Sequence, residues 1–305
     1  MTNPKPILRS LCFLLFNLVF GLFVRAETLT IATYNIENYG PADRMIEVGF
    51  RKDYPKPEAE KAALRRVIRG LNADVLVLQE MGGAPYVEEL RRDLRAEGTD
   101  YPHVAVASAA DADRHLALFS KRPLKNATTH ADLTFAYFGA KEAVKRGLLE
   151  VTIDTSDGAV TLFALHLKSR FTERADDPLS ETRRIGEATV IRDAVLKRFP
   201  APAAARFVIL GDCNDGKTSR AVARLEKKGE TEVAQLLAGS DSRGEVWSHF
   251  YRKEDSYSRV DQIFVSPGLA PTVVGGAARI YDGDGVSEAS DHRPLVMTLE
   301  FAGKK

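Results

Sequence analysis

Apolar residues along this 305-residue chain follow two spacings, one typical of helices and one typical of strands. Apolar residues three and four apart predict helices over 58–71 and 180–198. Shorter helices are predicted over 88–97, 219–228 and 232–237. The arginines of 180–198 are expected on the solvated face of its helix. Segments 41–57 and 281–289 show neither spacing, so both are predicted to be loops.

Short runs that are alternating or wholly apolar predict the strands. The main ones cover 28–35, 74–80, 115–120, 146–151, 160–166, 206–212, 247–251, 258–265 and 295–301. An Asp157-Gly158 pair between two of these runs is a strong signal for a tight hairpin. Strands separated by helices predict an α/β protein.

Polar side chains gather where the predicted strands end. They are Asn35, Glu37, Glu80, His166, Asp212, Asn214, Asp261, Asp291 and His292. Asp212 and Asn214 are two residues apart at a strand end, so their side chains point to the same side. Taken alone, that pair also fits an ordinary turn, and a lone strand-end histidine is more often structural than catalytic. Repetition of the pattern favours one shared site at the rim of a sheet.

The residue types in this set indicate a particular chemistry. Carboxylate and amide oxygens without cysteine suit Mg²⁺ or Mn²⁺ rather than zinc. Asp212 would then activate a water, the histidines would contact phosphate oxygens, and Asp261 would hold one histidine in the correct tautomer. Cys213 is expected to be buried and unreactive, and the sequence has no G-x-S-x-G serine-hydrolase elbow.

The first 26 residues read as a secretory signal peptide. Lys5 and Arg9 precede an uncharged apolar run, and Val24-Arg25-Ala26 offers a cleavage site after Ala26. The predicted domains are therefore the signal at 1–26 and one catalytic domain at 27–305, with a secreted or periplasmic product. An uncleaved membrane anchor is the alternative.

Cleavage would remove three basic residues and no acidic one, which changes the net charge from +1 to −2. The mature chain then has no general basic field for nucleic acid, and binding would depend on local cations such as Lys168, Arg170, Arg183 and Arg184. With one cysteine left it has no intramolecular disulfide. We find no long apolar hairpin of the membrane-inserting kind, so no stable membrane insertion is expected.

Six short motifs, in order, resemble the endonuclease/exonuclease/phosphatase superfamily of deoxyribonuclease I-like enzymes. They are Tyr34-Asn35-Ile36-Glu37, Gln79-Glu80, His166-Leu167-Lys168-Ser169, Gly211-Asp212-Cys213-Asn214, Arg259-Val260-Asp261-Gln262-Ile263 and Ser290-Asp291-His292. Each motif is weak alone, but six in order across about residues 28–302 are highly specific. The resemblance implies a four-layer α/β sandwich, with two mixed β-sheets face to face and helices outside.

The resemblance also implies roles for individual residues. Those implied as metal ligands are Asn35, Glu80 and Asp291, with Glu37 as a variable fourth. Asp212 would be the water-activating base and Asn214 its positioning partner. His166 and His292 would contact the scissile phosphate, and Asp261 would orient His292. Arg146 and Lys168 are possible further contacts.

The sequence therefore predicts a hydrolase of phosphoester bonds, a Mg²⁺- or Mn²⁺-dependent phosphodiesterase that is most simply an exported nuclease acting on nucleic acid. A phosphatase or a phospholipase C-type esterase, acting on a small or lipid phosphoester, is the alternative within the enzyme class. A catalytically silent binding module is disfavoured, because every expected chemical position carries a competent residue.

Overall fold

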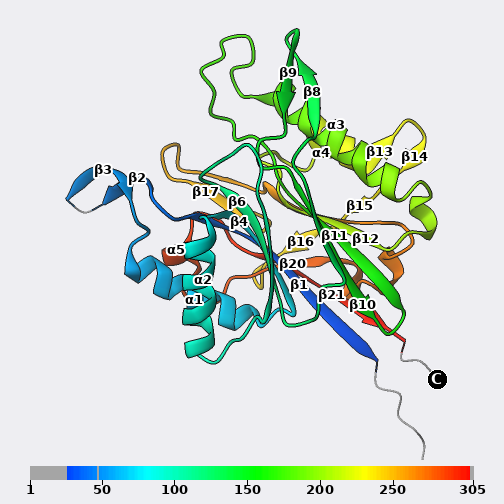
Figure 1. Cartoon of the computed structure of the whole chain (residues 1–305), viewed down its shortest axis with the longest axis horizontal. Helices are drawn as coiled ribbons and strands as arrows, with labels where there is room; N and C mark the ends of the chain where they lie inside the picture. Colours follow the sequence, from blue (N-terminus) through cyan, green and yellow to red (C-terminus); the bar gives the residue numbers. More distant parts are fainter. Residues whose placement is uncertain (1–25, 47, 303–305) are drawn as a thin grey trace, which may run out of the picture.

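Two large β-sheets packed face to face form the centre of the computed structural model, which describes residues 26–46 and 48–302 (Figure 1). The first sheet has the strand order β16-β20-β21-β1-β4-β6-β5. The bounds are Gly239–Ser240 for β16, Ala278–Ile280 for β20, Leu295–Phe301 for β21, Glu27–Tyr39 for β1, Val75–Met81 for β4, His115–Ser120 for β6 and His103–Ala107 for β5. Residues 1–25 of the predicted signal lie outside the described part.

The second sheet has the order β15-β19-β12-β11-β10-β7. The bounds are Gln235–Leu236 for β15, Asp261–Val265 for β19, Phe207–Asp212 for β12, Gly158–His166 for β11, Leu148–Thr155 for β10 and Asn126–His130 for β7. Each sheet is mixed and has a parallel pair at its centre, β1 with β4 and β11 with β12. Strands β16 and β20 are also parallel, at the edge of the first sheet, and the other neighbouring strands are antiparallel. The predicted pair of mixed sheets is confirmed.

Alternation along each strand divides the core into three layers of side chains. In β1, Ile31 faces the opposite sheet and Ala32 faces the helices. In β12, Val208 faces the opposite sheet and Phe207 faces the helices. Helices α1 (Glu58–Leu71) and α2 (Ala84–Ala96) cover the first sheet. Helices α3 (Glu181–Arg198) and α4 (Arg220–Glu226) cover the second, on the other side of the molecule (Figure 1). The predicted four-layer α/β sandwich is therefore confirmed.

Small elements decorate the sandwich. These are four hairpins, β2 (Ala42–Ile46) with β3 (Gly49–Tyr54), β8 (Thr134–Tyr137) with β9 (Ala140–Ala143), β13 (Lys227–Lys228) with β14 (Thr231–Glu232) and β17 (His249–Tyr251) with β18 (Ser256–Ser258), together with helix α5 (Val286–Ala289) and short 3₁₀ turns at Pro202–Ala204, Ala270–Thr272 and Val274–Gly276. No helix within residues 26–46 and 48–302 has both the length and the apolarity to cross a bilayer.

Three local predictions were wrong. Segment 41–57 contains the β2–β3 hairpin, whose side chains are mostly exposed and so leave no apolar alternation in the sequence. Segment 232–237, predicted as a helix, instead supplies β14 and β15, and β15 pairs with the edge of β19. Segment 281–289 contains the short helix α5.

Three of the four arginines of α3 are not on a solvated face as predicted, and only Arg198 is exposed. Arg183, Arg184 and Arg192 are each less than a tenth exposed. Arg184 donates to the Asp215 carboxylate at 3.1 Å and to the Leu179 carbonyl at 2.7 Å. Arg183 and Arg184 are buried and paired with carboxylates of the protein itself. They therefore do not supply the surface cations that the sequence suggested for nucleic acid.

Candidate active site

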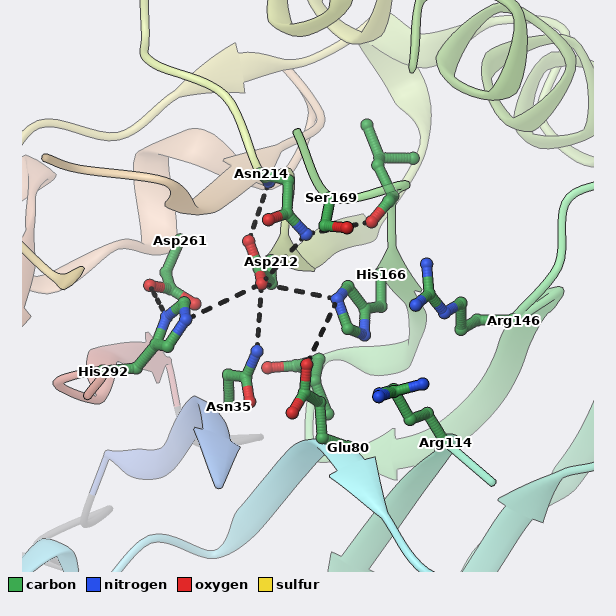
Figure 2. A network of polar contacts seen from close by, with 12 residues as sticks. Asn35, Glu80, Arg114, Arg146, His166, Ser169, Asp212, Asn214, Asp261 and His292 are labelled. Carbon is green, nitrogen blue, oxygen red and sulfur yellow. Dashed lines mark hydrogen bonds and ion pairs between the residues drawn. The ribbon is translucent and has the colours of Figure 1, made fainter. Parts of the chain in front are cut away.

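The polar strand ends meet at one rim of the sandwich because of the strand directions. Asn35, Glu80, His166 and Asp212 lie at the carboxyl ends of the parallel pairs β1/β4 and β11/β12. Asp261 begins β19, which runs antiparallel to β12 and places this residue directly opposite Asp212. Figure 2 shows these side chains converging on Asp212 from both sheets.

Backbone geometry at the rim is unusual. Glu80 (φ 62°) and Asn214 (φ 51°) adopt left-handed conformations that non-glycine residues seldom take and that recur at functional sites. Gly211 has φ 142°, and a Cβ there would lie 2.0 Å from the Leu165 carbonyl oxygen. Only glycine therefore allows β12 to approach β11 closely enough to place Asp212 beside His166.

Asp212 is the centre of the polar network and is only 1% exposed. One carboxylate oxygen, Oδ2, accepts from Asn35 Nδ2 at 3.0 Å and from Asn214 Nδ2 at 3.2 Å, and the other accepts from the Asn214 backbone N–H at 2.7 Å. Burial raises the pKa of Asp212 to about 6, although nearby His292 and the amide donors oppose the shift. A carboxylate with such a pKa can exchange a proton near neutral pH.

His292 is held by the buried carboxylate of Asp261. Its Nδ1 lies 2.8 Å from Asp261 Oδ2, which also accepts from the Ser248 hydroxyl at 2.7 Å. Burial alone would lower the pKa of His292, but Asp261, Asp212 and Asp291 together raise it well above the usual value. The protonated ring therefore donates Nδ1–H to Asp261 and presents Nε2–H, which is 3.9 Å from Asp212 Oδ2.

His166 is also buried, but its pKa is shifted in the opposite direction from that of His292. Its Nε2 lies 3.5 Å from Asp212 Oδ2 and 4.0 Å from Glu80 Oε1. Burial, with the positive charge of Arg146 next in importance, lowers the pKa of His166 well below the usual value. Its Nδ1 has no hydrogen-bond partner among the described residues. The site thus contains one neutral and one charged imidazole on either side of the same carboxylate.

The two possible basic contacts behave differently. Arg146 is buried, forms an ion pair with Asp111 at 2.9 Å, and lies beside His166 (Figure 2). Lys168 donates to the Ser169 carbonyl at 3.1 Å and to the Phe171 carbonyl, so its ammonium is bound to its own loop. Burial lowers the pKa of Lys168 to about 8.

Hard oxygen donors line the β1 side of the rim. The Glu37 backbone N–H donates to Asn35 Oδ1 at 3.1 Å, and the Asp291 backbone N–H donates to Glu37 Oε2 at 3.2 Å. Burial raises the pKa of Glu37, and the neighbouring charge of Asp291 adds to the shift. Two crowded carboxylates of this kind, beside Asn35 and Glu80, fit a divalent cation that would relieve their repulsion.

Within residues 26–46 and 48–302, no thiolate competes for such a cation. Cys213 is fully buried, and burial raises the pKa of its thiol well above the usual value. Two further groups in the described part each bring three possible ligand atoms within 4.8 Å of one another: Asp212 with Asp261 and His292, and His249 with Asp291 and His292. The oxygen donors and these imidazoles together make a site suited to a divalent metal.

Three residues at the rim had no signal in the sequence. Lys56 is buried, and its Nζ donates to the Glu37 carbonyl at 3.3 Å. Arg114 donates to Asn38 Oδ1 at 2.8 Å, and Figure 2 shows it near Glu80. His249 Nε2 lies 3.6 Å from Asp291 Oδ2, and its ring is 4.5 Å from that of His292. None of them ends a strand of the two large sheets, which was the pattern that identified the other residues.

A four-layer sandwich with oxygen donors and histidines at its strand ends defines a metal-dependent hydrolase of phosphoester bonds. Residues 32–292 match the family described as the Endonuclease/Exonuclease/phosphatase family. The chain belongs to this family, and the resemblance seen in its motifs is confirmed.

Solved structures of low sequence identity share the fold. Sphingomyelinase C from Streptomyces griseocarneus is 17% identical, with a TM-score of 0.62 over 90% of this chain and 99% of that one. An endonuclease/exonuclease/phosphatase from Bacteroides vulgatus is 16% identical, with a TM-score of 0.62 over 90% and 99%. The catalytic domain of human Nocturnin is 15% identical, with a TM-score of 0.59 over 90% and 97%. A comparison with curated protein sequences gave no significant match.

Proposed function

We propose that this protein is a Mg²⁺- or Mn²⁺-dependent phosphodiesterase that is exported and hydrolyses nucleic acid. One observation carries the proposal above all. A buried carboxylate, Asp212, faces a charged imidazole, His292, which a second buried carboxylate, Asp261, fixes through its other nitrogen. That arrangement places a proton acceptor and a proton donor at one rim, beside the oxygen donors of β1 and β4.

Each residue then has a distinct part in the hydrolysis. Asp212 accepts the proton of the attacking water, and Asn214 holds the carboxylate in position through its backbone and side-chain donors. His292 donates Nε2–H to an oxygen of the phosphoryl group, and Asp261 keeps it charged and oriented. Neutral His166 provides a second contact to the same group.

Asn35, Glu80 and Asp291, with Glu37 as a further donor, are the residues that would hold the cation. Once bound there, Mg²⁺ or Mn²⁺ supplies positive charge that neutralises the phosphodiester and its transition state. The crowding of Glu37 and Asp291 supports this assignment.

Export rests on the first 26 residues. A basic start, an uncharged apolar run and a small residue at position 26 are the features of a cleavable signal, which leaves 27–305 as the catalytic domain. Nucleic acid is the favoured substrate because Arg114 lies beside the site and Arg170 is exposed on the loop that follows β11. A choline phospholipid is the second candidate, because a sphingomyelinase shares the fold.

A substrate panel tests the proposal. Purified mature protein with Mg²⁺ would be incubated with plasmid DNA, RNA, sphingomyelin and p-nitrophenyl phosphates, and product followed over time. We expect cleavage of DNA or RNA, abolished by Asp212→Asn and by His292→Ala without loss of the folded state. Asp154→Asn, an exposed carboxylate at the far end of β10, is the matched control and should keep full rate.

Turnover of sphingomyelin alone would reject the nuclease assignment while leaving the phosphodiesterase chemistry intact. Full activity in both site variants would reject the mechanism itself.

A further inference from the structure

A cavity of about 620 Å³ adjoins the proposed site, and apart from Asp291 its lining residues take no part in the mechanism above. Asp291 Oδ1 lies 4.0 Å from His292 Nε2, so this residue connects the cavity with the site. Its volume falls in the range of pockets that hold small organic ligands. The wall of interest comes from the β17–β18 hairpin and the residues just before it.

This hairpin is fixed to the segment that carries His292. The Phe250 backbone N–H donates to the Asp291 carbonyl at 2.9 Å, and the Arg293 backbone N–H donates to the Ser248 carbonyl at 2.6 Å. His249 and His292 form an antiparallel bridge between the two segments. The hairpin is therefore held in a set position relative to His292.

Three aromatic rings form the cavity wall. Phe250 and Tyr257 are stacked with ring centroids 4.6 Å apart, and Trp247 meets Tyr257 edge-on at 4.8 Å. Tyr257 lines the cavity and is 58% exposed, so this cluster does not belong to the core. Exposed aromatic surface inside a cavity is what a flat, apolar ligand group requires.

Charged groups of both signs line the cavity. Arg243, Arg252 and Arg293 are on its wall, but Arg243 and Arg293 form ion pairs with Asp241 and Glu245, and the Arg293 guanidinium lies 4.2 Å from the Trp247 ring. Asp284 and Asp291 add negative charge to the lining. Asp282 and Glu288 also line the cavity, and carboxylates accept hydrogen bonds from the exocyclic amino groups of bases.

We propose that this cavity binds a nucleobase of the nucleotide next to the scissile phosphate, with Tyr257 as the stacking surface. The inference rests on the proposed nuclease function and names the part of the substrate that the protein would recognise. Stacking on an aromatic ring tolerates any base, so it predicts preference for nucleic acid without a strict sequence. A choline headgroup is the competing occupant.

Trp247 allows binding to be measured without catalysis, because it is the only tryptophan in the chain. Its fluorescence would be followed while the mature protein is titrated with adenosine 5′-monophosphate, ribose 5-phosphate and phosphocholine. We expect the adenine nucleotide to bind about tenfold more tightly than ribose 5-phosphate, which has the same phosphate but no base. Phosphocholine should bind no better than ribose 5-phosphate.

Tyr257→Ala should remove most of that tenfold preference, and Tyr257→Phe, which keeps the ring, should retain it. The same variants would then be assayed on a single-stranded oligonucleotide and on its abasic analogue. Tyr257→Ala should lower kcat/KM about tenfold on the first, equivalent to about 1.4 kcal/mol, and leave the second unchanged. Unchanged cleavage of the abasic strand also shows that the variant is folded.

Equal binding of adenosine 5′-monophosphate and ribose 5-phosphate, or an equal loss on both oligonucleotides, would overturn the inference. Tighter binding of phosphocholine, lost in Tyr257→Ala, would assign the cavity to a choline headgroup instead. Failure of the nuclease proposal gives a different result, because the wild-type protein would then cleave neither oligonucleotide while the fluorescence titration still reports on the cavity.

Discussion

Replacing Asp261 with asparagine tests the pair that fixes His292. The substitution keeps the side-chain shape and one acceptor, but it removes the charge 2.8 Å from Nδ1. In an effective dielectric of about 20, that charge contributes about 6 kcal/mol to a protonated imidazole before desolvation is counted. Burial of both groups offsets much of this gain. The difference between a charge-assisted and a neutral hydrogen bond is smaller, about 1.5 kcal/mol. We take it as the lower bound on the stabilisation of protonated His292 that Asp261→Asn removes.

If the transition state loses at least about 1.5 kcal/mol of this stabilisation, kcat of Asp261→Asn should fall at least about tenfold. The pH profile should also change. Asp261 raises the pKa of His292, and the active form is the protonated one, so removing the charge lowers that pKa. The alkaline limb of the rate profile should therefore move to lower pH. The assay is the steady-state rate on the best substrate of the panel between about pH 5 and 10.

Ser248→Ala provides the matched comparison, because its hydroxyl donates to the same Asp261 oxygen at 2.7 Å but carries no charge. It should leave the alkaline limb in place and lower kcat by less than the asparagine variant. Thermal unfolding of both variants separates a loss of rate from a loss of structure. A wild-type kcat with an unmoved alkaline limb in Asp261→Asn would refute the role given to this pair.

Three further outcomes are expected. Chelation with EDTA should abolish hydrolysis, and added Mg²⁺ or Mn²⁺ should restore it; activity that survives exhaustive chelation would contradict the metal assignment. Because burial raises the pKa of Asp212 to about 6 and the base must be ionised, kcat/KM should rise as pH increases through about 6, and a flat acid limb would be contrary evidence. Arg184→Ala removes the buried partner of the Asp215 carboxylate and should lower the free energy of unfolding in urea by about 3 kcal/mol. Arg170→Ala, whose half-exposed side chain lies 3.9 Å from the same carboxylate, should cost less than about 1 kcal/mol, and equal losses would show that burial is not the cause.

Local patterns predicted those parts of the fold whose side chains face the core. Helix α1 has the bounds that its apolar spacing predicts, because one face of it packs against the first sheet. The β2–β3 hairpin exposes Met45 and Phe50 and has no core face, so the sequence carries no period there. Strand β15 is formed by pairing with β19, a contact between distant segments that no local pattern encodes.

The residues of the site also divide into those that a local sequence pattern identifies and those that only the assembled fold brings together. Asp212 and Glu80 were found because each lies at the end of a buried strand, and strand ends are recognisable in a sequence. Lys56 and His249 come from a loop and a hairpin whose positions depend on the assembled sandwich. The burial of Arg184 could not be predicted for a related reason, since its partner Asp215 follows a strand far away in the chain.

The two sheets contribute different halves of the proposed chemistry. Asn35 and Glu80 belong to the first sheet, while His166 and Asp212 belong to the second. The hydrogen bond from Asn35 Nδ2 to Asp212 Oδ2 joins the halves, so the distance between cation and base is set by how the sheets pack. That packing rests on a shared layer of buried aliphatic side chains. Close-packed interiors allow little sliding, and the sandwich therefore supplies the fixed geometry in which a water activated by Asp212 on one sheet would meet a phosphate neutralised by a cation on the other.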